Sequence, residues 1–429
     1  MEKVELDIVS NGMDGEGIAR KDGKVFFIDG AIEGEKVLAI ITKENKNFST
    51  AKLDQILEKS QFRCKPECKF FDKCGGCNLQ HMAYKKQLKI KRQNVQNLFN
   101  KLNLKYEVLN CKKSQLEYGY RNKLTLYLNE NNSLCFYKKN SKELIEINNC
   151  CLVDNKFNYL IKKLNIFFKD NREFSFVLKG VSIRKINDFF IISLILTKKT
   201  NLDNLQNYLK LFKINYALYY CINNKKNSNI PLEPCYFVGG ENKIYLTEFN
   251  IKYPVYPLSF LQVNNEIKKK IYSQIVEFVK GHKNVLDAYS GAGLLSAILA
   301  KSNEQVFAVE INPSAHEASR QLCKMNNIQN VINICADCAK ELPQLIKNYN
   351  FDCIVLDPAR AGVDKVILNT INNAGIKNVI YLSCNPATLA RDLKILVEGG
   401  YNITFAQPYD MFPQTANVET LVKLEYKGN

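Results

Sequence analysis

Apolar positions in the last third of the chain form short continuous runs, separated by segments with helical spacing. Each run is rich in Val, Ile, Leu or Phe and ends beside a glycine, an acidic residue or a cysteine. The runs cover residues 284–288, 305–309, 331–335, 351–356 and 380–384. Such an alternation is typical of parallel strands covered by helices on both faces. The pattern therefore predicts an α/β Rossmann-like, doubly wound sheet over residues 256–429.

The first 60 residues show a different pattern, with short alternating runs between glycine turns and no helical spacing. Apolar residues recur in 6–9, 24–28 and 36–40. Several short strands joined by tight turns predict a small β-barrel over residues 1–60. Barrels of this kind often bind nucleic acid on one face.

Residues 61–255 mix strand-like runs with helical pieces and predict a central α+β domain. In the segment at about 82–104, apolar residues recur with helical spacing among lysine, glutamine and asparagine residues. We expect a packing helix there, with the predicted sheet of residues 256–429 as a candidate partner.

The chain carries 60 Lys and Arg against 43 Asp and Glu, a formal net charge of +17. Such an excess favours a polyanionic partner such as RNA, although an AT-rich coding bias would also raise the lysine count. Acidic and basic residues interrupt the N-terminal stretch, and no apolar run approaches the length of a membrane span. These features predict a cytoplasmic protein.

Fifteen cysteines without a secretory signal favour metal binding or catalysis over a disulfide framework. Four of them share the short polar loop 64–77, and only Cys74 and Cys77 form a Cys-x-x-Cys pair. Zinc is one alternative, but three near ligands with one distant ligand suit a four-iron cluster better. The candidates for the distant ligand are Cys150 and Cys151.

Cys384 ends the apolar run 380–384, and Asn385-Pro386 stops that run at once. A thiol at the carboxyl end of a parallel strand lies where open α/β sheets bind ligands, so it can serve as a nucleophile. The alternative is a small buried core residue.

A glycine turn at Gly291 and Gly293 follows the first predicted strand, and Glu310 ends the second. Glycines allow a nucleoside to approach the backbone, and an acidic residue about twenty positions further on can accept hydrogen bonds from ribose. Ser296 replaces the third glycine of a dinucleotide motif. The pattern therefore favours S-adenosylmethionine, which has no phosphate.

The segments 382–392 and 410–419 resemble the two signatures of the RNA uracil-C5 methyltransferases. The similarity extends to 260–264, to 357–360 and to the first segment, which resembles a TRAM domain. Because of the cysteine loop, the closer match is the iron–sulfur branch of this family, which mostly modifies 23S rRNA. The resemblance implies that Cys384 is the nucleophile that attacks C6 of uracil and that Glu419 is the general base.

The same resemblance implies a set of cofactor contacts and a [4Fe-4S] ligand set. The implied cofactor contacts are Gln262, Tyr289, Glu310, Asp337 and Asp357. The implied cluster ligands are Cys68, Cys74, Cys77 and Cys150. The chain departs from the family pattern at Ser290, at Leu294 and at Asn417, where histidine is usual.

The expected activity is methyl transfer from S-adenosylmethionine to C5 of a specific uridine in structured RNA, with 23S rRNA as the expected substrate and a monomer as the expected state. The alternatives are a tRNA uridine-C5 methyltransferase, a cytosine-C5 methyltransferase, and a non-catalytic RNA-binding or ribosome-assembly factor on the same scaffold.

Overall fold

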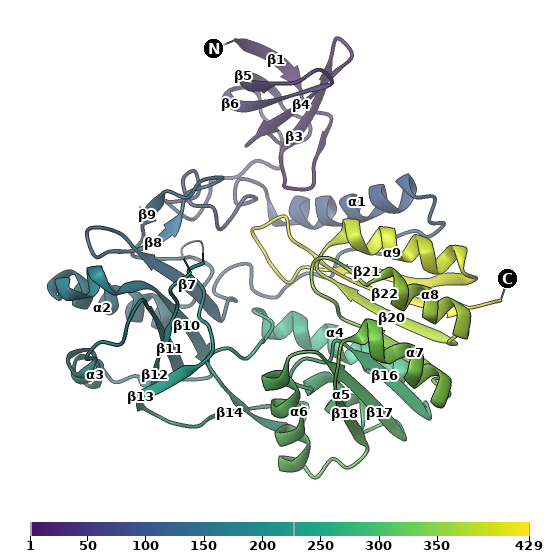
Figure 1. Cartoon of the computed structure of the whole chain (residues 1–429). Coiled ribbons are helices and arrows are strands. Elements are labelled where there is room, and N and C mark those ends of the chain that lie inside the picture. Colours follow the sequence, from purple (N-terminus) through teal and green to yellow (C-terminus); the bar gives the residue numbers. More distant parts are fainter. Residues whose placement is uncertain (1, 226–227, 429) are drawn as a thin grey trace.

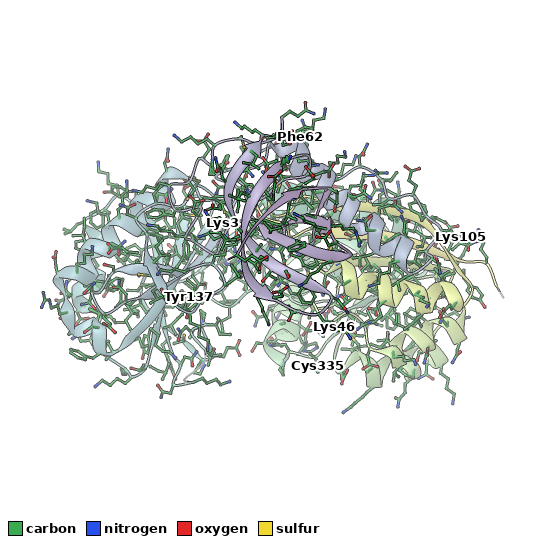
Figure 2. The ribbon with its side chains drawn as sticks, turned by 90° about the horizontal axis from the view of Figure 1, so that it is seen from above. Lys3, Lys46, Phe62, Lys105, Tyr137 and Cys335 are labelled. Carbon is green, nitrogen blue, oxygen red and sulfur yellow. The ribbon has the colours of Figure 1, made fainter. Side chains whose placement is uncertain are left out.

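The computed structural model describes residues 2–225 and 228–428, which form a small barrel above two larger α/β parts (Figure 1). Seen from above, the barrel lies over the junction between these two parts (Figure 2). No helix in the described part of the chain combines the length and apolarity that crossing a bilayer requires.

The barrel is a six-stranded sheet with strand order β1-β5-β6-β4-β3-β2. Its core consists of inward-facing apolar side chains from alternate strand positions, which is the burial expected from the period-two pattern. The strands are β1 (Lys3–Asp7), β2 (Ser10–Asn11), β3 (Gly17–Lys21), β4 (Lys24–Asp29), β5 (Lys36–Glu44) and β6 (Phe48–Glu58).

The central part is a seven-stranded mixed sheet of order β13-β12-β11-β10-β7-β8-β9, and helices α2 and α3 contribute to its main core. Its elements are β7 (Lys123–Leu128), β8 (Leu134–Tyr137), β9 (Leu144–Glu146), α2 (Asn155–Asp170), β10 (Leu178–Ile186), β11 (Phe189–Leu196), α3 (Asp203–Lys210), β12 (Asn215–Ile222) and β13 (Cys235–Gly240), with a 3₁₀ turn at Arg172–Phe176. A hairpin of β14 (Ile244–Glu248) and β15 (Ile251–Val255) follows and shares a core with the last part of the chain.

The last part is a seven-stranded sheet of order β18-β17-β16-β19-β20-β22-β21, in which β16 to β20 are parallel. The strands are β16 (Asn284–Ala288), β17 (Gln305–Glu310), β18 (Val331–Cys335), β19 (Cys353–Leu356), β20 (Asn378–Ser383), β21 (Tyr401–Tyr409) and β22 (Glu419–Tyr426). The helices are α4 (Asn265–Val279), α5 (Leu294–Leu299), α6 (Pro313–Met325), α7 (Cys338–Asn348), α8 (Lys365–Ala374) and α9 (Pro386–Glu398).

The direction of strand addition in this sheet reverses between β16 and β19. In open α/β sheets, ligands bind beyond the carboxyl ends of the strands at such a switch point. The antiparallel strand β22 lies between β20 and β21, begins at that edge and runs away from it. Its first residue, Glu419, therefore lies beside the end of β20.

Helix α1 (Tyr84–Lys101) packs on α9 and β21, and buries Val95 and Phe99 in the core of the last sheet. At its other end, Ile90 shares a small buried cluster with Ile32 of the barrel, Leu79 and Met82. This cluster forms the interface between the barrel and the rest of the chain.

Hydrogen bonds to the glycine turn of the barrel are also part of this interface. Asn94 Nδ2 donates to the Gly12 carbonyl at 3.1 Å, and Asn78 Nδ2 donates to the Asp14 carbonyl at 2.6 Å. Gly15 has a positive φ of 87°, and a Cβ there would lie 2.3 Å from the Leu79 side chain. Glycine is therefore required at this contact.

Candidate active site

A cavity of about 450 Å³ opens at the carboxyl edge of the last sheet. Side chains from the ends of β16, β19 and β20, from the start of β22 and from the segment before α4 line it. Five of the seven residues predicted for catalysis and cofactor binding line this cavity: Gln262, Tyr289, Asp357, Cys384 and Glu419.

The glycine turn forms one wall of the cavity. Gly293 has a φ of 80°, and a Cβ there would lie 1.9 Å from Ser319 Oγ, so only glycine fits. A Cβ on Gly291 would meet nothing within 4 Å, so its backbone is open to a ligand. The Gly291 amide donates to Glu310 Oε2 at 2.9 Å, and the Asn312 amide donates to Glu310 Oε1 at 2.7 Å.

Glu310 and Asp337 lie at the neighbouring strand ends and are absent from the cavity lining within the described residues. Asp337 caps helix α7 by accepting a hydrogen bond from the Ala339 amide at 2.9 Å. Glu310 pairs in register with Cys335, two residues before Asp337. Glu310 therefore contacts the glycine turn directly, and Asp337 lies at the next strand end along the same edge of the sheet.

Cys384 follows β20 directly, and Asn385 caps α9 by accepting a hydrogen bond from the Ala387 amide. Asn385 Nδ2 and Thr388 Oγ1 both donate to the Arg360 carbonyl, at 3.0 and 3.2 Å. These bonds hold the thiol beside the loop after β19. Burial raises the pKa of Cys384, and the Glu419 carboxylate raises it further, while the Arg360 guanidinium lowers it.

Glu419 is 3% exposed and is the first residue of β22. Burial raises its pKa well above the usual value, and Asp357 adds to this effect, while Arg360 opposes it. A carboxylate whose charged form is disfavoured in this way is a stronger base than a solvated one.

Asp287 and Arg360 contribute to the site without having been assigned a role from the sequence. Asp287 is buried in the cavity wall, accepts a hydrogen bond from Ser296, and has a pKa raised to about 7 by burial. Arg360 lowers the pKa values of both Cys384 and Glu419. The signal for Arg360 was its place in the segment 357–360, whereas Asp287 looked like an ordinary strand residue.

The predicted cluster ligands Cys68, Cys74, Cys77 and Cys150 line a second cavity of about 570 Å³, together with Cys151. Burial raises the pKa values of Cys77 and Cys150 to about 12, and neighbouring thiols act in the same direction. Cys64 lies outside this lining and donates to the Gln80 carbonyl. Within residues 2–225 and 228–428, no three His, Cys, Asp or Glu side chains are close enough to bind a metal ion.

A Rossmann-like sheet with an open glycine turn, a flanking acidic residue and a cavity at the switch point is the arrangement of a nucleoside-binding enzyme, the class to which S-adenosylmethionine-dependent methyltransferases belong. The solved structure of the tRNA (uracil-54, C5)-methyltransferase of Pyrococcus abyssi, in complex with S-adenosyl-L-homocysteine, superposes with a TM-score of 0.80 and 25% identity. The match covers 98% of this chain and 99% of that one. The profile of the tRNA (uracil-5-)-methyltransferases matches residues 83–427. The chain belongs to this family.

The TRAM profile matches residues 2–53. Two uncharacterized RNA methyltransferases also match over nearly their full length. That of Clostridium acetobutylicum is 35% identical, over 98% of this chain and 96% of its own. That of Thermotoga maritima is 31% identical, over 99% of both chains. The predictions of a Rossmann-like methyltransferase with an N-terminal TRAM domain, and of an S-adenosylmethionine-dependent enzyme acting on RNA, are confirmed.

Proposed function

We propose that this enzyme methylates C5 of one uridine in 23S rRNA through a covalent bond between Cys384 and C6 of the base. The observation that carries the proposal is that Cys384 and Glu419, which come from different strands, line one cavity with three of the predicted cofactor contacts. A thiol and a base on the same cavity wall are the two groups that this reaction requires.

The reaction begins when the Cys384 thiolate adds to C6, because C5 of uracil is otherwise too weak a nucleophile. The electron pair moves to C5, which then displaces S-adenosylhomocysteine from the methyl carbon. Glu419 removes the C5 proton, and the electrons of that C–H bond re-form the C5–C6 double bond and expel the thiolate. Arg360 favours the ionised forms of both groups.

The cofactor supplies an activated methyl group, and the residues of the cavity fit it. Gln262, Tyr289 and Asp357 from the cavity lining would hold it, together with Glu310 beside the glycine turn and Asp337 at the next strand end. The open backbone at Gly291 allows the close approach that a nucleoside requires. Lining that is mostly apolar, with a few polar groups, is typical of cofactor sites.

The substrate assignment predicts that 5-methyluridine forms in 23S rRNA transcripts incubated with the enzyme and labelled S-adenosylmethionine. Uridine-containing substrates should be methylated and matched cytidine substrates should not.

Mapping 5-methyluridine in RNA from a deletion strain should show one missing position. A missing position in tRNA would instead favour the second candidate, which the tRNA (uracil-54, C5)-methyltransferase of Pyrococcus abyssi supports. RNA binding with no methyl incorporation would overturn both.

We also propose that Cys68, Cys74, Cys77 and Cys150 hold a [4Fe-4S] cluster with a structural or RNA-orienting role. The four thiols line one cavity, and thiolates are the usual ligands of such clusters. Protein purified without oxygen should be brown and contain about four iron atoms per chain, as expected for this cluster type. Cys77→Ser should lose the colour, whereas Cys64→Ser should keep it. Colourless protein with stoichiometric zinc would contradict the assignment.

A further inference from the structure

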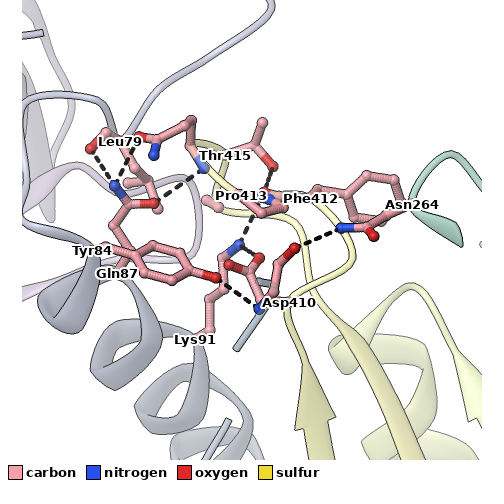
Figure 3. Close-up of polar contacts among 12 residues, drawn as sticks. Leu79, Tyr84, Gln87, Lys91, Asn264, Asp410, Phe412, Pro413 and Thr415 are labelled. Atoms are coloured by element: carbon pink, nitrogen blue, oxygen red, sulfur yellow. Dashed lines mark hydrogen bonds and ion pairs between the residues drawn. The ribbon is translucent and has the colours of Figure 1, made fainter. Parts of the chain in front are cut away.

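The segment 410–418 links β21 to Glu419 and places Phe412 in the wall of the active-site cavity. Figure 3 shows that Gln87 and Lys91 of helix α1 contact this connection and that Gln87 also contacts Leu79, in the segment before the helix. The partners are therefore residues 78–91, which are distant in sequence and directly follow the cysteine loop.

Gln414 has a strained backbone conformation within this connection. Its φ is 70°, a left-handed value that costs energy for any residue other than glycine, and its side chain is buried. Such a conformation persists only where the surroundings over-determine it. The Gln414 carbonyl accepts hydrogen bonds from the amides of Asn78 and Leu79, at 3.2 and 3.1 Å.

Gln87 provides the remaining restraint on Gln414. Its Oε1 accepts a hydrogen bond from the Gln414 amide at 3.1 Å, and its Nε2 lies 2.9 Å from Gln414 Oε1. The same Nε2 is 3.1 Å from the Leu79 carbonyl and 2.9 Å from the Met82 carbonyl. One buried amide therefore joins the left-handed residue to the segment before α1.

Further contacts hold the connection on both sides of Gln414. Lys91 forms a fully buried ion pair with Asp410, and its Nζ also donates to the Phe412 carbonyl at 3.1 Å. The Ala416 amide donates to Asn78 Oδ1 at 2.8 Å. The connection is thus held at several points by residues 78–91.

We propose that Gln87 is a positioning residue for the general base. It acts through Gln414 on the connection that presents Glu419 and Phe412 to the bound base. The proposal rests on the proposed role of Glu419. The hydrogen bonds that hold the Cys384 loop go instead to Arg360. Loss of Gln87 should therefore slow removal of the C5 proton more than attack by Cys384.

The test compares Gln87→Ala with Gln93→Ala, a matched control on the exposed face of the same helix. Turnover on uridine RNA should fall by roughly 10- to 100-fold in Gln87→Ala, because a small misplacement of a catalytic group has effects of that size. The covalent RNA adduct should accumulate on a denaturing gel. Adduct formation with 5-fluorouridine RNA, which has no C5 proton to remove, and binding of S-adenosylhomocysteine should stay within about twofold of the parent enzyme.

A second pair of variants tests the backbone conformation. Gln414→Gly and Gln414→Ala both lose the side chain, but only glycine adopts the positive φ without strain. Gln414→Gly should therefore retain more turnover and accumulate less adduct. Equal behaviour of this pair, or equal slowing of every step in Gln87→Ala, would overturn the proposal. Failure of Glu419→Gln to trap an adduct would instead overturn the role of Glu419 as the general base, on which this proposal rests.

Discussion

Replacing Cys384 with alanine should abolish formation of 5-methyluridine and leave binding of S-adenosylmethionine nearly intact. The variant removes the proposed nucleophile, so the turnover number should fall by roughly 10⁴-fold or more, as for other covalent nucleophiles. Cofactor affinity should change little, because the predicted cofactor contacts come from other strands. Methyl incorporation into RNA and calorimetric titration with the cofactor measure the two effects.

Cys335→Ala is the matched control for this experiment. Cys335 is an exposed cysteine at the end of β18, on the same edge of the same sheet. Its loss should leave turnover unchanged. Substantial turnover in Cys384→Ala would rule out the covalent route.

Glu419→Gln should convert the enzyme into one that forms the RNA adduct but does not release it. Glutamine has nearly the same shape but accepts no proton under these conditions, so elimination should slow by roughly 10²- to 10⁴-fold. Attack by Cys384 should not slow, because the Glu419 carboxylate raises the pKa of that thiol and a neutral amide does not. Less thiol should therefore be protonated at a given pH.

The adduct should appear as a slow-migrating band with labelled RNA on a denaturing gel, and peptide mass spectrometry should locate a methylated uridine on Cys384. Glu425→Gln, near the other end of β22, is the control and should release its product normally. If Glu419→Gln gives no adduct while Cys384→Ala is inactive, another group removes the proton.

The sequence predicted the part of the site that depends on strand ends. Cys384 and Asp357 each follow an apolar run, and the carboxyl ends of parallel strands meet at one edge, so their proximity follows from the fold class. Glu419 was different, because its position depends on β22 lying antiparallel between β20 and β21. Only the family resemblance indicated its role.

Other features depend on contacts that local patterns do not encode. Gln87 and Gln414 are 327 positions apart, and each is an ordinary polar residue until the packing of α1 brings them together. Asp287 likewise lies within a strand, and its raised pKa is a consequence of burial in the folded sheet. The grouping of Cys77 with Cys150 required the central sheet to bring two distant loops to one cavity.

Because the barrel packs on residues 78–94, the first sixty residues should also stabilise the rest of the enzyme, in addition to any role in binding RNA. Their removal would uncover Leu79, Met82 and Ile90, and would take away the carbonyl partners of Asn78 and Asn94. Asn78 also accepts a hydrogen bond from the amide of Ala416, three residues before the proposed general base. An enzyme without these residues should therefore have a lower turnover number, even on an RNA fragment too short to contact the barrel.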